Sequence, residues 1–281
     1  GALLALSKPP GLPVLARHGE LSLVVLLPAL RRRLGLPAEL HVVKAPAREC
    51  SGLVLLSGCR RATEQLQRFF SNTRRNGQYP VTYRAVTVGI PAEAEGEIRT
   101  GLCWQQQGDT AVVRGVRGLG VQGAAPRWGL RAVPLQVVPV PAAGRRSLAR
   151  KEVKSTLTRY QVLGATGGCA LLQLQPKTGE SHPNTLLCPF LLARSHPPRS
   201  SPAFPEQLQV HLTLLLCPAL GDHEHSSRVG KVLGVPFLLP PEAAPTRTQV
   251  LDEELLCRLG LSAQQLRHLP LHIHLQQLVL P

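Results

Sequence analysis

The order of apolar and polar positions predicts short strands and helices that follow one another along the chain. Residues Val81–Val88 alternate between two faces with the two-residue period of a strand. Within Arg61–Arg75, by contrast, Leu66, Phe69 and Phe70 recur at helical spacing between basic flanks. These two stretches carry the clearest periodicity, and they predict one strand and one helix.

Other stretches carry weaker versions of the same patterns. They predict a helix over 22–34 broken by Pro28, strands over 53–56, 170–174 and 208–216, a helix over 250–259 that stops at Gly260, a helix opened by the capping box Ser262-x-x-Gln265, and a strand through Leu271, Ile273 and Leu275. Strands and helices are interspersed with few clean repeats of a crossover unit. We therefore expect the α+β class.

Two long stretches show no sustained period. Residues 108–131 are rich in Gly, Arg and Val, and residues 179–203 hold several prolines with Ser and Arg between them. Structureless loops of this length are uncommon inside compact domains. We therefore expect a single domain over 1–281 with insertions at 108–131 and 179–203. Because Gly179-Glu180-Ser181 can be encoded by a splice-donor sequence and Pro202-Ala203 by an acceptor, the second insertion is a candidate retained intron; the same hypothesis is kept for the first insertion, which shows no such signal.

The charge balance narrows the class of partner. The chain has 32 Lys and Arg against 17 Asp and Glu, which gives a formal charge of +15 and a pI near 10.4. Such an excess predicts attraction to a polyanion, with nucleic acid favoured, although it can also serve as a solubilising surface. Aromatic residues make up only 4%, which is too few for wide base-stacking platforms.

Cysteine spacing and hydropathy exclude further classes. The seven cysteines are scattered and never spaced as C-x-x-C, which argues against a zinc ribbon or a disulfide framework and favours a reducing compartment. The longest apolar run, Leu21–Leu30, is about half a membrane span, so we expect none. Because the chain starts at Gly1 and contains no Met, we interpret it as a fragment in which a missing targeting segment carries no weight.

Four landmarks in sequence order resemble motifs of the RluA-type, or large-subunit-type, RNA pseudouridine synthases. They are Lys8-Pro9-Pro10-Gly11-Leu12-Pro13-Val14, then Glu49-Cys50-Ser51-Gly52-Leu53, then Tyr83-x-Ala85-Val86-x-Val88-Gly89, and finally Gln207-Leu208-Gln209-Val210-His211-Leu212 with Leu220-Gly221-Asp222. The likeness is greater still to mitochondrial members of that family. It implies a bent, mostly antiparallel mixed sheet flanked by helices, a basic cleft for mitochondrial mRNA or rRNA, no cofactor, and a place in the mitochondrial matrix.

The same resemblance exposes a vacancy at the catalytic position. In the family motif Arg-Leu-Asp-x-x-Thr-Ser-Gly-Leu, the aspartate lies four residues before the serine, and counting back from Ser51 reaches Ala47. Making pseudouridine requires cleaving a C–N bond, rotating the base and rejoining it at C5. A carboxylate beside the sugar can attack C1′, remove a C2′ proton or balance positive charge at the anomeric carbon, and alanine can do none of these.

Two more positions take roles from the resemblance. Tyr83 is expected to contact the flipped base, with an ordinary strand tyrosine as the alternative. Gln209 stands where the family has an arginine thought to pair with the aspartate. Losing one member of a buried ion pair would strand a charge at a cost of about 3–5 kcal/mol, whereas here both positions are neutral. Of the nearby groups, Glu49 lies two residues past the vacant position, Asp222 fits a turn, and Cys50 has no identifiable base.

Basic clusters supply the expected contacts with RNA phosphates, although each could also be a solvated helix face. One cluster is expected on a helix and comprises Arg145, Arg146, Arg150, Lys151, Lys154 and Arg159; the other comprises Arg60, Arg61, Arg68, Arg74 and Arg75. Lys8 is expected to join them, although its turn could serve mainly to shape the backbone. His223-x-His225 and His272-x-His274 lack adjacent carboxylates or cysteines at suitable spacing, so we expect no metal site.

Three hypotheses about function remain open from the sequence. The chain is a synthase acting on mitochondrial RNA, as the resemblance implies, or an RNA-binding pseudoenzyme with the same cleft, perhaps serving RNA or ribosome assembly, or a mis-spliced product that folds poorly. The missing carboxylate favours the pseudoenzyme for the chemical step. Oligomeric state is not indicated by any pattern.

Overall fold

The core of the molecule is a nine-stranded mixed sheet. The structure is a computed structural model, and it describes residues 3–15, 19–72, 78–106, 135–140, 154–178, 206–240, 243–244 and 248–281. The strand order of the sheet is β1-β3-β11-β4-β8-β7-β5-β6, with β2 also paired to β3. The strands are β1 (Leu3–Lys8), β2 (His41–Lys44), β3 (Ser51–Ser57), β4 (Val81–Val88), β5 (Glu95–Gln106), β6 (Leu135–Val140), β7 (Lys154–Thr166), β8 (Cys169–Thr178) and β11 (Ile273–Leu278).

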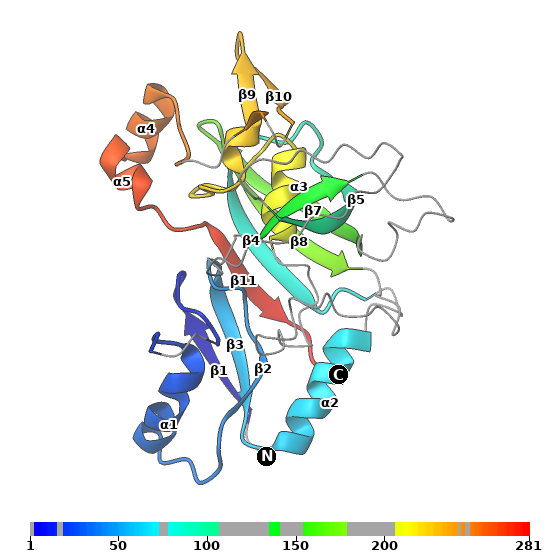
Figure 1. Cartoon of the computed structure of the whole chain (residues 1–281), viewed down its shortest axis with the longest axis vertical. Coiled ribbons are helices and arrows are strands. Elements are labelled where there is room, and N and C mark those ends of the chain that lie inside the picture. Colours follow the sequence, from blue (N-terminus) through cyan, green and yellow to red (C-terminus); the bar gives the residue numbers. More distant parts are fainter. Residues whose placement is uncertain are drawn as a thin grey trace, which may run out of the picture.

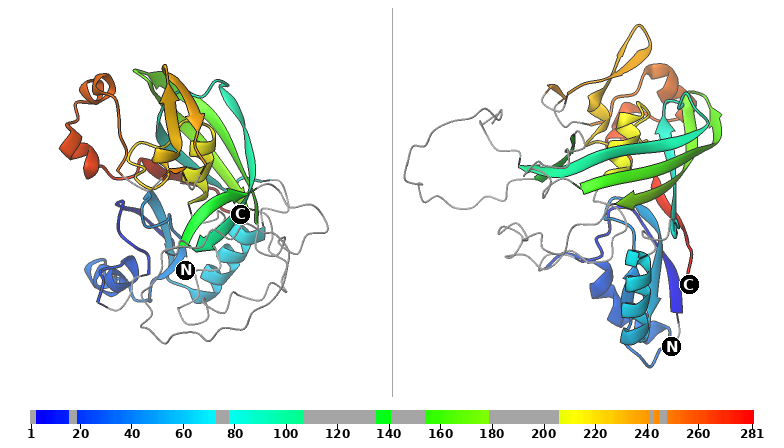
Figure 2. Two further views of the ribbon diagram at one scale, coloured as in Figure 1. Left: turned by 45° about the horizontal axis from the view of Figure 1, so that its top comes forward. Right: turned by 90° about the vertical axis from the view of Figure 1, so that its right-hand side faces the viewer.

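The sheet bends where β11 joins its two halves (Figure 1). β11 pairs in parallel with β3 only at His274 and Leu275, and antiparallel with β4 along its length; the other strand pairs of the sheet are all antiparallel. Figure 2 shows β5, β7 and β8 running across the direction of β1 and β3. This bent, mostly antiparallel mixed sheet confirms the predicted α+β class.

Helices flank both halves of the sheet. They are α1 (Leu23–Arg33), α2 (Arg60–Asn72), α3 (Gln207–Leu214), α4 (Glu253–Leu259) and α5 (Ala263–Arg267), and a short 3-10 turn, η3 (Ser226–Arg228), precedes a separate hairpin of β9 (Val229–Val232) and β10 (Val235–Leu238). α2 packs on β2 and β3, whereas α3 packs on β5, β6, β7 and β8. α4 and α5 stand together beside the upper end of β11 (Figure 1).

The largest hydrophobic cluster lies between the sheet and α3. It joins Leu208 and Leu212 of the helix to alternate residues of the central strands, namely Tyr83, Ala85, Leu172, Leu174, Ile273 and Leu275. The two-residue alternation along β4 is that of a strand, as predicted, because Val81, Tyr83, Ala85 and Thr87 are all buried on one face. A smaller cluster holds α1 against β3 through Leu23, Leu27, Val54 and Leu56.

Several predicted elements are confirmed with shifted ends. The strands over 53–56 and 170–174 fall within β3 and β8, and the helix within Arg61–Arg75 is α2. α4 ends at the left-handed Gly260 as predicted, but it begins only at Glu253 because Asp252 caps it through the Leu255 N–H. The capping box of Ser262 and Gln265 is present at the start of α5.

Three predictions about elements are wrong. Residues 208–216 do not form a strand: α3 covers most of them, and because Gln207–Thr213 is buried on every side, no helical period shows in the sequence. α1 is not broken at Pro28, since burial of Leu23 and Leu27 outweighs the one lost backbone hydrogen bond. Lys154 and Arg159 lie on β7 rather than on a helix.

The two predicted insertions, 108–131 and 179–203, lie outside the described residues. The same holds for Arg145, Arg146, Arg150 and Lys151 of the expected basic helix, and for Arg74 and Arg75. The single-domain interpretation stays a prediction.

Candidate active site

The loop over 45–50, between β2 and β3, carries the vacant catalytic position, and Lys8 anchors it. The Lys8 ammonium donates hydrogen bonds to the carbonyls of Pro9 at 2.9 Å, Leu12 at 2.9 Å and Arg48 at 3.0 Å. Only 1% of Lys8 is exposed, and burial lowers the pKa of its amine. Its three donors are committed to the backbone, which favours the alternative that the turn shapes the backbone, and the contact of Lys8 with RNA stays a prediction.

Ala47 lies exposed on this loop and presents only a methyl group. Its carbonyl accepts a hydrogen bond from the Cys50 N–H at 3.2 Å, which tightens the turn into β3. The one acid of the loop, Glu49, has a side chain 55% exposed and lies 3.5 Å from the Arg48 guanidinium, which also pairs with Glu20 at 2.8 Å. Glu49 therefore already belongs to a solvent-exposed ion-pair network.

Gly52 explains why the Ser-Gly of the motif is present in this chain. Its φ is +123°, and a Cβ built there would lie 2.4 Å from both the backbone nitrogen and the carbonyl oxygen of Leu275. No other residue fits where β3 meets β11 in parallel. The neighbouring Ser51 hydroxyl also bonds His274 Nδ1 at 2.9 Å across the same junction.

Cys50 and Tyr83 meet below the loop in the main hydrophobic cluster. Burial raises the pKa of the Cys50 thiol to about 12, so the group stays protonated at neutral pH and is no nucleophile. Burial also raises the pKa of Tyr83, with a further contribution from Cys50. Tyr83 is 6% exposed, and its backbone lies between Leu174 of β8 and Leu275 of β11.

α3 supplies three buried polar side chains from the fourth landmark. Gln207 donates to the Leu157 carbonyl at 2.9 Å, and His211 bonds Thr156 at 3.0 Å and Thr158 at 2.8 Å. Burial lowers the pKa of His211 to about 4, so its imidazole is neutral. These groups fix α3 on β7, and α3 in turn holds Gln209, the vacant arginine position, 7% exposed.

The Gly-Asp landmark forms a turn close to the loop. Gly221 has φ +79°, and a Cβ there would meet the Pro270 carbonyl oxygen at 2.1 Å. Asp222 Oδ1 accepts from the N–H groups of Glu224 and His225, each at 3.0 Å, which confirms the turn role expected for this aspartate. The Asp222 charge raises the pKa of Cys50, so the turn and the loop lie within electrostatic reach of each other.

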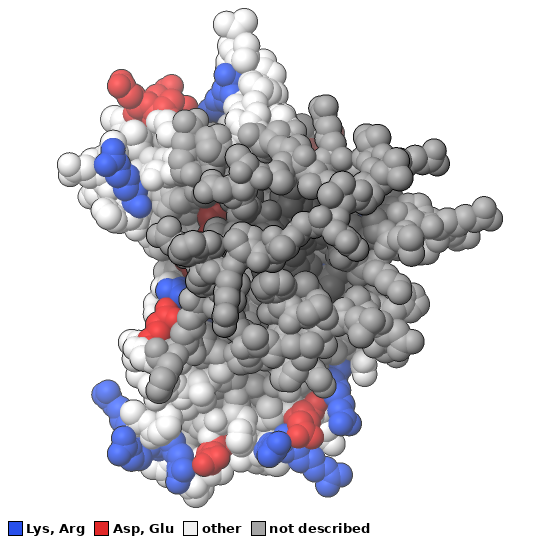
Figure 3. All heavy atoms as spheres, viewed as in Figure 1, with Lys and Arg blue, Asp and Glu red and all other residues white. Residues whose placement is uncertain are grey.

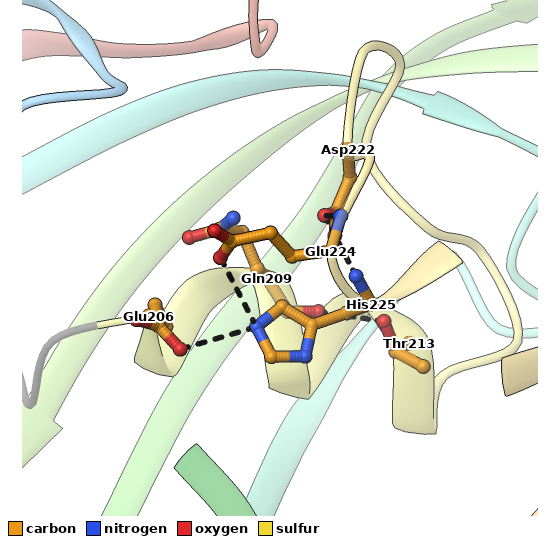
Figure 4. A network of polar contacts seen from close by, with 6 residues as sticks. All are labelled: Glu206, Gln209, Thr213, Asp222, Glu224 and His225. Carbon is orange, nitrogen blue, oxygen red and sulfur yellow. Dashed lines mark hydrogen bonds and ion pairs between the residues drawn. The ribbon is translucent and has the colours of Figure 1, made fainter. Parts of the chain in front are cut away.

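A polar network missed by the sequence analysis lies beside this turn (Figure 4). His225 Nε2 lies 3.3 Å from Glu206 Oε2 and 4.0 Å from Glu224 Oε2. Although burial opposes it, the hydrogen bond that His225 donates to Glu206 and the charge of Asp222 raise the pKa of His225. The expectation that no carboxylate accompanies this histidine is therefore wrong; the adjacent Glu224 was the available sign, whereas Glu206 is 19 residues away.

Basic residues are visible at one end of the face drawn in Figure 3. Figure 3 shows Lys and Arg over α1 and α2, with acidic residues between them. Arg60 is exposed and lies 3.5 Å from Glu64, one turn along α2, and Arg61 is exposed beside it. Arg159 of β7 instead pairs with Glu97 at 2.8 Å, a carboxylate that it shares with Arg99, and covers the Tyr79 ring at 5.0 Å.

No helix in the described part of the chain is long and apolar enough to span a membrane.

Comparison with known proteins matches residues 2–183 to the family described as RNA pseudouridylate synthase. Over its full length the chain is 42% identical to mitochondrial mRNA pseudouridine synthase Rpusd3 of Mus musculus, of which it covers 68%, and to the Homo sapiens protein, of which it covers 66%.

A more distant relative and a solved structure agree with this match. The chain is 30% identical to mitochondrial pseudouridylate synthase RPUSD4 of Danio rerio over 99% of its own length and 64% of that protein. Its fold is similar to human RNA pseudouridylate synthase domain containing 4, with a TM-score of 0.58 and 26% identity over 97% of this chain and 78% of that one.

Proposed function

Because this chain belongs to the RNA pseudouridylate synthase family, we propose that it binds RNA in mitochondria and isomerises uridine to pseudouridine. The match that spans the whole chain, at 42% identity to proteins named as mitochondrial mRNA pseudouridine synthases, is the observation that carries the proposal. Mitochondrial mRNA is therefore the first substrate class to test, with mitochondrial rRNA as the second.

Tyr83 is the proposed contact for the flipped base. It lies on β4 and shares a hydrophobic cluster with Cys50, the last residue of the loop that holds the vacant position. A uridine must leave its base stack before its C–N bond can be cleaved, and an aromatic ring can hold the extruded base. Arg60 and Arg61 are the proposed phosphate contacts, since both are exposed on α2.

A second function follows from the exposed methyl group of Ala47: RNA binding without isomerisation. Glu49 is engaged with Arg48, and Asp222 is 1% exposed and bonds two backbone N–H groups. Neither acid is therefore placed to take over attack at C1′ or proton removal at C2′, because Glu49 is held by an ion pair and Asp222 is buried away from any ribose. In this alternative the cleft and its RNA affinity are kept, and only turnover is lost.

Release of tritium from RNA labelled at C5 of uridine separates the two functions, because isomerisation exchanges that hydrogen. The purified chain is expected to release tritium from mitochondrial mRNA transcripts and to lose at least about 100-fold in rate on Tyr83→Phe if the hydroxyl acts in catalysis. A double variant with Ala47→Asp and Gln209→Arg restores the family pair and serves as a gain-of-function control.

The outcomes are distinct. Release by the unmodified chain supports the synthase. Release only from the double variant, with RNA affinity unchanged, establishes the pseudoenzyme instead. Absence of RNA binding by every variant, in protein shown to be folded by circular dichroism, would refute both functions.

A further inference from the structure

We propose that Glu206, Glu224 and His225 form a binding site for one divalent transition-metal ion, Zn²⁺ in particular. One nitrogen and two carboxylate oxygens from these residues lie within 4.8 Å of one another. They converge from the residue that precedes α3 and from the turn that follows Asp222, two segments joined here only through side chains (Figure 4). Gln209, the vacant arginine position, belongs to the same polar network (Figure 4), but none of the three ligand residues has a part in the proposed isomerisation.

The spacing of the three atoms suits a small tetrahedral ion. Zinc binds imidazole nitrogen and carboxylate oxygen at about 2.0–2.2 Å, so two ligand atoms of a tetrahedral site lie roughly 3.3–3.5 Å apart. His225 Nε2 is 3.3 Å from Glu206 Oε2 and 4.0 Å from Glu224 Oε2. The His225–Glu206 distance already suits such an ion, and the Glu224 side chain, 55% exposed, has room to bring its oxygen closer to the other two atoms.

The scaffold around His225 is rigid. The imidazole has a side chain 2% exposed, and the Asp222 carboxylate fixes the backbone of Glu224 and His225 through two hydrogen bonds of 3.0 Å. Glu206 is held by the first turn of α3, whose Val210 N–H donates to the Glu206 carbonyl at 3.0 Å. Preorganised ligands of this kind lose little conformational entropy when an ion binds.

A second observation points to a bound species at this turn. Within the described residues, the buried side-chain atoms that lack a hydrogen-bond partner are Asp222 Oδ2, Ser226 Oγ and Ser227 Oγ, and all three lie within six consecutive positions around His225. Asp222 is 1% exposed, and its other oxygen, Oδ1, accepts hydrogen bonds from the backbone N–H groups of Glu224 and His225 at 3.0 Å, so the orphaned oxygen belongs to a carboxylate bonded to two of the three ligand residues. A coordinated cation with its waters satisfies such atoms.

The donor set selects the class of ion. One imidazole and two carboxylates suit zinc and other first-row transition metals, whereas magnesium and calcium prefer sites made of oxygen alone. The alternative occupant of this position is a proton on His225, paired with Glu206. A metal ion and that proton compete for the same nitrogen, so a direct metal titration distinguishes them.

The test is isothermal titration of the full chain with zinc chloride, after dialysis against a chelator and with Cys59→Ser and Cys257→Ser in the background, since accessible thiols also bind zinc. We expect one saturable site per chain. His225→Gln and Glu224→Gln should each weaken it by at least about tenfold. His268→Gln, just after α5, and Glu253→Gln, at the start of α4, change exposed groups of the same types and should leave it unchanged.

Two results would overturn the site. One is the absence of saturable binding in protein that circular dichroism shows to be folded; the other is equal affinity in the site variants and the control variants, which means surface binding only. Glu224→Gln keeps the test valid if His225→Gln does not fold, because the Glu224 side chain is 55% exposed. Excess magnesium should not displace the zinc. Because the readout is metal binding, it is independent of RNA binding and turnover.

Discussion

At the scale of single residues, most positions that carry the family likeness stabilise the backbone of the fold. Lys8 bonds three carbonyls, Gly52 admits the backbone of β11, Gly221 admits Pro270, and Asp222 fixes a turn. Each of these needs is set by backbone geometry and does not depend on a catalytic carboxylate. The motifs therefore persist beside Ala47 because the fold still requires them.

Gly52→Ala should destabilise the protein by at least about 2 kcal/mol. The added Cβ would lie 2.4 Å from backbone atoms of Leu275 at a φ of +123°, and a strand junction cannot yield as a flexible side chain can. Urea unfolding followed by circular dichroism measures the change.

Gly164→Ala is the matched control for that substitution. A Cβ at Gly164, also in a strand, meets nothing within 4 Å, so the free energy of unfolding should stay within about 0.5 kcal/mol or rise slightly. Equal losses in the two variants would contradict the explanation by close approach.

His211 should make stability depend on pH. Its pKa is about 4 in the folded protein against 6.5 for an unperturbed histidine, so between these values the unfolded chain binds a proton that the folded chain does not. Stability contributed by the neutral imidazole is therefore complete above pH 6.5 and is lost as pH falls, by about 2 kcal/mol at pH 5.

Comparison with His211→Gln isolates this effect, because glutamine does not titrate and can still hydrogen-bond Thr158. The free energy of unfolding of the unmodified chain should fall between pH 7.5 and pH 5 by about 2 kcal/mol more than that of the variant. The pKa of His225 is raised, so its contribution to stability has the opposite sign: it is present below the unfolded pKa and lost at higher pH. This contribution is the same in both proteins and cancels when their free energies of unfolding are compared. Parallel pH profiles would show that His211 is not buried as described.

At the scale of elements, a helix or strand can be predicted from the periodicity of the sequence only if one of its faces is buried and another is exposed. β4 has one face in the core and α2 has one stripe against β2 and β3, so each shows its period in the sequence. α3 is buried all round and has no period to read, and it was predicted as a strand. The most enclosed helix of the site was thus the hardest to recognise.

Lys8→Met tests the anchoring of the 45–50 loop. The methionine keeps the length of the side chain but leaves the carbonyls of Pro9, Leu12 and Arg48 without their shared donor, which should cost about 2 kcal/mol of stability. The dependence of RNA affinity on salt should not change, because the buried ammonium touches no phosphate.

Lys231→Met is the control for an exposed lysine, since that side chain is 55% exposed in a surface pair with Asp252. Its effect on stability should stay below about 1 kcal/mol. A salt dependence altered by Lys8→Met, at full stability, would establish Lys8 as an RNA contact.

At the scale of the whole molecule, a net charge of +15 should make RNA affinity fall steeply with salt. Each phosphate contact in single-stranded RNA contributes about 0.7 to the slope of log affinity against log salt. Replacing Arg60 and Arg61 together with glutamine should therefore reduce that slope by about 1.4, measured by fluorescence anisotropy with a labelled transcript. Arg258→Gln with Arg267→Gln, on α4 and α5, should leave it unchanged, and equal effects would place the RNA elsewhere.

The sequence by itself determined what depends on near neighbours and on motif order: the periodicity of β4 and α2, the caps of α4 and α5, the positive charge, and the family likeness with its vacancy at Ala47. Only the tertiary structure decided what depends on residues far apart in the chain. Glu206 reaches His225, the Lys8 ammonium reaches the Arg48 carbonyl, and Gly52 meets Leu275 because the sheet folds these segments together. No local pattern encodes such contacts, since each is fixed by the packing of the whole bent sheet.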